Sequence, residues 1–88
     1  MKMQDKSKIL RKSVSEIVNE LRNSQDKEYL KFCDENSIAT STYDNVINGV
    51  TNVTFYNLSK FIKGLGISFK EFGELLDKRL PKEFWDEE

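Results

Sequence analysis

Residues 40–48 form a stretch of hydrogen-bonding side chains that suits molecular recognition. Hydroxyls, amides and one carboxylate dominate this stretch, and Gly49 follows it. Val46 and Ile47 predict a buried inner side for a short helix, which Asn48 and Gly49 would end. A short helix with a mostly uncharged, hydrogen-bonding outer face suits the reading of base edges in a DNA groove. An ordinary short helix in a small bundle is the alternative that we weigh equally on this segment alone. The candidate base-contacting residues are Thr40, Ser41, Thr42, Asp44, Asn45 and Asn48.

Catalytic and metal-binding chemistry find little support in these residue types. The chain contains no histidine and a single cysteine, Cys33, which cannot make a zinc site or an internal disulfide. Its 15 acidic residues are ordinary for a solvated surface, and no nucleophile–base pair or phosphate-binding glycine loop accompanies them. We therefore predict no enzyme activity, no metal and no cofactor, and we expect Cys33 to be buried packing.

Length and composition indicate one globular domain. Among the 88 residues, 33% are charged and 38% are hydrophobic, which is typical of a folded chain on the polar side. No signal-peptide pattern and no run approaching about 18 apolar residues is present. We therefore expect a cytoplasmic protein without membrane contact.

The charge is unevenly distributed along the chain. The net charge of -1 argues against a general nucleic-acid binder. Residues 1–24 nevertheless carry six basic and three acidic groups, whereas residues 71–88 carry three basic and seven acidic groups. This asymmetry is compatible with one face that meets phosphate and another that points away, and equally with an ordinary solvated surface.

Helical periodicity predicts an all-α domain over residues 1–80 and an acidic, aromatic tail over residues 81–88. Apolar residues recur at spacings of three and four, with capping residues between the runs. Asp5 or Ser7 would cap the first helix and Ser24 or Asp26 the second. The predicted helices cover about residues 6–23, 26–35, 40–48, 55–65 and 69–79.

Further capping signals and the tail complete this prediction. Thr54 would cap the fourth helix, and Ser68 with Glu71 would form a capping box for the fifth. The tail contains side chains too apolar for a free segment, so we expect them to pack on the domain or on a second copy or partner. This candidate dimer or partner surface comprises Leu80, Phe84 and Trp85.

Two motifs with a joint spacing lie in the second half of the chain. The matching residues are Phe32 and Cys33 before a turn, Ser37, Ile38 and Ala39 in it, Ser41, Thr42, Tyr43 and Val46 in the helix, Asn48 and Gly49 at its end, then Thr54, Leu58, Lys60 and the segment GLGISFKEF at 64–72. From about residue 30 to residue 72, the chain resembles the Cro and phage-repressor type (xenobiotic-response-element-like) helix-turn-helix family of DNA-binding domains. The resemblance covers about half of the chain and implies a compact five-helix repressor-like fold.

This resemblance implies a role for the segment around residues 40–48. The helix would enter the major groove of double-stranded DNA with its early residues at base edges. Phosphate contacts would come from the start of the second helix and from the loop after the third. The candidate phosphate-contacting residues are Lys27, Tyr29, Lys31, Thr51, Asn52 and Lys60.

The chain departs from the family pattern at several positions. Tyr29 stands where the family often has a phosphate-binding glutamine. Asn36 stands in a turn that usually contains glycine, where asparagine is the next best residue at positive φ. Ala39 replaces the usual capping serine, so Thr40 or Ser41 would have to cap the helix. No basic residue lies between Lys31 and Lys60. Since phosphate neutralisation supplies much of the affinity, we expect weak binding by a monomer.

Two functions remain open at this stage. The first is a sequence-specific transcriptional regulator, repressor-like, that binds DNA as a homodimer on two half-sites. The alternative is a protein-interaction or antitoxin-like module on the same fold, with weak or no DNA binding and a protein partner at its acidic end.

Overall fold

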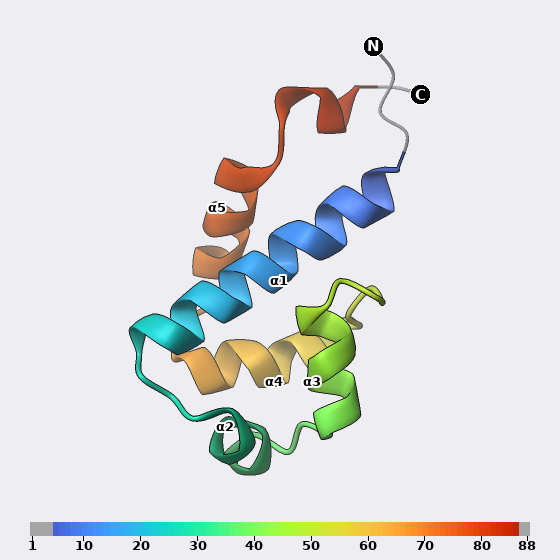
Figure 1. The fold of residues 1–88 in the computed structure, drawn as a ribbon. Helices are drawn as coiled ribbons and strands as arrows, with labels where there is room; N and C mark the ends of the chain where they lie inside the picture. The colour runs from blue at the N-terminus through green and yellow to red at the C-terminus, as the bar shows by residue number, and fades with distance from the viewer. Residues whose placement is uncertain (1–4, 87–88) are drawn as a thin grey trace.

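A computed structural model describes residues 5–86, and all regular structure within this range is helical. The prediction of an all-α domain with five helices is confirmed (Figure 1). The elements are α1 (Lys6–Ser24), α2 (Tyr29–Glu35), α3 (Thr40–Ile47), α4 (Phe55–Leu65), α5 (Phe69–Arg79) and a 3-10 helix, η1 (Lys82–Trp85). None of the helices in this range has the length and apolar character needed to cross a membrane.

The long helix α1 is the element on which the others pack. It contacts α3, α4 and α5, and Figure 1 shows it crossing the molecule between α5 and the pair formed by α3 and α4. Its inward stripe follows the predicted spacing, because Val14, Ile17 and Val18 are buried. Burial of this stripe, rather than helix propensity, is what stabilises a helix of this size in water.

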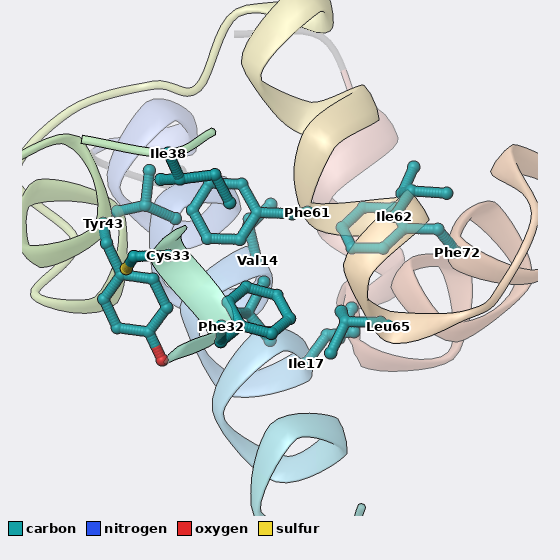
Figure 2. Close-up of a cluster of buried hydrophobic side chains, with 12 residues drawn as sticks. Val14, Ile17, Phe32, Cys33, Ile38, Tyr43, Phe61, Ile62, Leu65 and Phe72 are labelled. Atoms are coloured by element: carbon teal, nitrogen blue, oxygen red, sulfur yellow. The ribbon is translucent and has the colours of Figure 1, made fainter. Parts of the chain in front are cut away.

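The hydrophobic core draws side chains from all five helices (Figure 2). Phe32 of α2 and Phe61 of α4 are among the largest fully buried side chains. Cys33 is 2% exposed, so the prediction that it serves as buried packing is confirmed. Tyr43 of α3 is 3% exposed, although the residue pattern predicted only Val46 and Ile47 on the inner side of this helix. Its burial means that α3 is seated on the domain by an aromatic ring as well as by Val46.

Most of the predicted local signals at the helix starts are confirmed. The Asp5 carboxylate accepts a hydrogen bond from the Lys8 amide at 2.9 Å, and the Thr54 hydroxyl accepts one from the Asn57 amide at 3.1 Å. Ser68 and Glu71 form the reciprocal capping box. These contacts span three residues, so they depend on the local sequence and little on the tertiary structure.

The predicted start of the second helix is wrong. It begins at Tyr29 rather than near residue 26, because Asp26 has φ 55° and lies outside the right-handed helical region. Neither Ser24 nor Asp26 caps it. The Glu28 carboxylate takes that role by accepting hydrogen bonds from the amides of Leu30 and Lys31 at 3.1 and 3.0 Å.

The turn between α2 and α3 also differs from the prediction. The left-handed residue is Ser37, with φ 55°, whereas Asn36 has φ -110°. The amides of Ser37 and Ile38 bond back to the carbonyls of Asp34 and Cys33, the pattern of a Schellman C-cap. Ala39 is the N-cap of α3 and no side chain caps that helix, so neither Thr40 nor Ser41 replaces the missing serine.

Candidate nucleic-acid interface

Helix α3 has one buried side and one exposed polar side. Tyr43 and Val46 are each 3% exposed and face the core. Ser41, Asn45 and Asn48 are exposed and follow one another at spacings of four and three, so they form one line along the helix. The outer face therefore offers a hydroxyl and two amides to a ligand, with the exposed carboxylate of Asp44 beside them.

The end of α3 is bonded to α1. Gly49 has φ 67°, and the amide of Val50 donates to the carbonyl of Asn45 at 2.9 Å. The Arg11 Nε of α1 donates to the Gly49 carbonyl at 3.0 Å. A guanidinium at this position complements the negative end of the α3 dipole. Arg11 thus places a positive charge beside α3, although none lies near α3 in the sequence.

The loop that follows α3 makes a second contact with α1. The Asn52 side-chain amide donates to the Ser7 hydroxyl at 2.9 Å, and the Arg11 guanidinium donates to the same oxygen at 2.6 Å. Ser7 and Arg11 were not among the predicted site residues. No local signal could have identified them, because 45 residues separate Ser7 from Asn52. The excess of basic residues in residues 1–24 was the only sequence feature that indicated a role for this segment near the site.

The start of α2 reaches α3 through Tyr29. The ring of Tyr29 lies 4.9 Å from the ring of Tyr43, and its hydroxyl donates to Asp44 Oδ1 at 2.9 Å. The hydrogen bond to Asp44 and partial burial raise the pKa of Tyr29 above its ordinary value of 10.0. A predicted phosphate-contacting residue and a predicted base-contacting residue are therefore bonded to each other.

Two of the three predicted lysines make hydrogen bonds within the domain. The Lys27 ammonium donates to the Gly64 carbonyl at 2.6 Å, near the carboxyl end of α4. The Lys60 ammonium donates to the Ser37 carbonyl at 3.1 Å and lies 4.6 Å from the centre of the Tyr56 ring. Lys31 is exposed on α2. Lys60 thus keeps its charge beside the turn that precedes α3, whereas Lys27 is held at the carboxyl end of α4, and both positions serve the fold as well.

Several of the predicted site residues lie on or beside α3, whereas the Lys27 ammonium lies at the carboxyl end of α4. Tyr29 bonds to α3 itself, Lys60 bonds to the turn before it, and Thr51 and Asn52 lie in the loop after it. Most of the predicted side chains are accessible. Those that are exposed are Lys27, Lys31, Thr40, Ser41, Asp44, Asn45, Asn48, Thr51 and Asn52, and those that are half-buried are Tyr29, Thr42 and Lys60.

The three residues of the candidate dimer or partner surface differ in their exposure. Leu80 and Phe84 are half-buried, whereas Trp85 is 71% exposed. The Lys6 ammonium donates to the Asp86 carbonyl and lies 5.8 Å from the centre of the Phe84 ring. The segment after α5 therefore turns back toward the start of α1 (Figure 1) and leaves the tryptophan in solvent.

The structure defines a five-helix, all-α domain in which α3 presents an exposed polar face. No protein-family model, curated protein or solved structure matches the chain.

Proposed function

We propose that this chain is a sequence-specific DNA-binding transcriptional regulator of the repressor type, which reads the major groove with the outer face of α3. The observation that carries the proposal is the division of α3 into a buried side, Tyr43 and Val46, and an exposed line of Ser41, Asn45 and Asn48. Asparagine pairs with adenine through both of its amide groups, and serine hydroxyls accept or donate at several base edges.

In this proposal, α2, the turn over residues 36–39 and α3 act as a helix-turn-helix of the Cro and phage-repressor type. The Schellman turn at Ser37 and the buried Ile38, which is 6% exposed, support this view because they fix the direction in which α3 leaves the turn. The exposed Thr40 and half-buried Thr42 at the start of α3 add a hydroxyl and a methyl group for contact with thymine.

Affinity for phosphate is expected to be modest in one copy of the chain. Helix α3 contains no basic residue, and Lys27 and Lys60 already bond to carbonyls of the domain. Arg11 adds a positive charge at the end of α3, and Lys31 adds one on the surface of α2. A homodimer on two half-sites about one helical turn of DNA apart would double these contacts.

Selection from randomised duplex DNA at low salt tests the proposal directly. We expect the full chain to enrich one sequence family and to bind it with an affinity that falls as salt rises. Fluorescence anisotropy on an enriched duplex measures both effects, and an electrophoretic shift with the DNA upstream of its own gene gives a first site. If no sequence is enriched and no salt-dependent binding occurs, the proposal is wrong.

A protein-interaction or antitoxin-like module is the second candidate, and the exposed Trp85 favours it. This tryptophan packs edge-on against Phe84 at 4.9 Å within an acidic segment, which suits a partner with a basic, apolar groove. Binding of a purified partner that requires Phe84 and Trp85 but not Asn45 would support this candidate over the first.

A further inference from the structure

The hydroxyl of Tyr29 is already engaged within the domain. It donates its proton to Asp44 Oδ1 at 2.9 Å. A phosphate oxygen can only accept hydrogen bonds, so a phosphate contact would need this same proton. The contact with Asp44 and the phosphate contact that the resemblance implies are therefore mutually exclusive for this side chain.

The position of the Tyr29 hydroxyl is set by the core. Its ring lies 4.9 Å from Tyr43, which is 3% exposed and lies 6.0 Å from the buried Phe32. Because Tyr43 belongs to α3 and Phe32 to α2, the Tyr29 ring lies at the junction of these two helices. Packing of the Tyr29 ring therefore positions its hydroxyl next to Asp44 without the help of a ligand.

Asp44 gains a defined orientation from this bond. It is exposed on α3 one residue before Asn45, and its second oxygen, Oδ2, has no hydrogen-bond partner among the residues that the structure describes. A free aspartate side chain on a surface samples several rotamers, and a hydrogen bond to one oxygen restricts them. The unused oxygen is thereby available to a ligand in a preset direction.

A carboxylate discriminates sharply among base edges. In the major groove it can accept from the amino group of cytosine, whereas the oxygen and nitrogen acceptors of guanine and the oxygen of thymine repel it. Adenine also presents an amino group, but its neighbouring N7 acceptor opposes a second carboxylate oxygen. Cytosine is therefore the base that an oriented Asp44 suits best.

We infer that Tyr29 is a positioning residue that orients Asp44, and that this pair makes the α3 face select cytosine at one position of its DNA site. The inference rests on the proposed function and deepens it by assigning one base and the pair of residues that reads it. Tyr29 then contributes to specificity and not to the phosphate contacts.

The test compares the wild-type chain with Tyr29→Phe, Asp44→Asn and the double variant on duplexes from the selection. Each C·G pair of the enriched site is replaced in turn by T·A, and affinities are measured by anisotropy at several salt concentrations. We expect the wild type to prefer cytosine at one position by about tenfold. Tyr29→Phe keeps the ring, so it should reduce that preference by about threefold or more while leaving the salt dependence unchanged.

The other variants complete the comparison. Asp44→Asn should remove the cytosine preference, and Tyr29→Phe should add no further change in the Asp44→Asn background because the two residues act as a unit. Tyr56→Phe is the matched control, since Tyr56 is 72% exposed and should leave the base preference intact. Melting curves of all variants verify that the fold is retained.

The outcomes separate this inference from the proposed function. If Tyr29→Phe weakens binding to all sequences equally and leaves the cytosine preference unchanged, Tyr29 is a phosphate contact and the inference is overturned. A cytosine preference that survives Asp44→Asn, or a wild type that enriches a site without such a position, overturns the inference alone. A wild type that binds no duplex refutes the proposed function, and the inference falls with it.

Discussion

The ring of Tyr43 stacks on the ring of Phe61, with centroids 5.7 Å apart and planes inclined by 25° (Figure 2). Tyr43 belongs to α3, the helix that presents an exposed polar face. Phe61 belongs to α4 and is completely buried. Aromatic pairs of this kind contribute about 0.5–1.5 kcal/mol beyond the burial of their surface. The stack therefore links the orientation of α3 to the packing of the core.

Phe61→Ala should strongly destabilise the domain. Loss of a fully buried phenylalanine removes apolar contacts and leaves a cavity, which costs about 3–5 kcal/mol in the free energy of unfolding. Chemical denaturation followed by circular dichroism measures this change. Phe55→Ala on the same helix is the control, because Phe55 is 80% exposed and its truncation should change stability by about 0.5 kcal/mol or less. Equal effects of the two substitutions would contradict the assignment of the core.

Gly64→Ala should destabilise the domain even though alanine favours helices. A Cβ at this position would lie 2.5 Å from Asn36 Nδ2 and 2.7 Å from Phe32 Cε2, so α2 and α4 would have to move apart. Overpacking of this kind costs about 1–3 kcal/mol. The matched control is Gly73→Ala in α5, where a Cβ meets nothing within 4 Å. The Gly73→Ala variant should gain about 0.5–1 kcal/mol in the free energy of unfolding. Thermal melts of both variants test these predictions, and a stabilising Gly64→Ala or a destabilising Gly73→Ala would contradict them.

Ser37→Gly should stabilise the domain. Ser37 has φ 55° directly after Asn36, the C-cap of α2, and at this position an L-residue is strained and glycine is not. Relief of this strain, reduced by the greater freedom of glycine in the unfolded chain, should contribute about 0.5–1 kcal/mol. Asn36→Gly should instead destabilise the domain, because the Asn36 amide donates to the Phe32 carbonyl at 2.8 Å. Denaturation midpoints that rank the two variants in the opposite order would refute this account of the turn.

Asn45→Ala should remove the sequence preference at the one position that Asn45 reads, without changing the fold. Asn45 is exposed at the centre of the outer face of α3, so its truncation leaves the core intact. If it reads adenine, its loss costs about 1–3 kcal/mol of discrimination at one position. Asn19→Ala, at an exposed position on α1, is the control and should leave both properties unchanged. Selection profiles and circular dichroism test this, and an unaltered profile for Asn45→Ala would count against its assignment.

The folded protein should lose stability at alkaline pH. A hydrogen bond to Asp44 raises the pKa of Tyr29, and burial raises the pKa values of Cys33 and Tyr43 above their ordinary values of 9.0 and 10.0. The unfolded chain therefore loses these protons at a lower pH than the folded chain does. The stability that these three groups contribute should be fully present below their ordinary pKa values. It should be lost as the pH rises through their raised pKa values in the folded chain. Denaturation from about pH 8 to about pH 11 measures the decline, and a flat profile would contradict these assignments.

Local sequence predicted the helices well where the determinants lie within one turn. The caps at Asp5, Thr54 and Ser68 each join residues three apart, so they could be recognised without the fold. The start of α2 was missed because Asp26 adopts a left-handed conformation, in which the amides of Asp26 and Lys27 bond back to the end of α1. The role of Asn36 was misjudged for a similar reason, since its side chain bonds to α2 and meets α4.

The candidate site divides in the same way. The sequence alone predicted an all-α domain and a polar outer face for the helix near residues 40–48, because helical periodicity depends only on spacing along the chain. Only the tertiary structure decided that Tyr43 is buried, that Tyr29 bonds to Asp44, and that Arg11 lies against the end of α3. These contacts join residues 15 and 38 positions apart, and packing of the helices on α1 and α4 creates them.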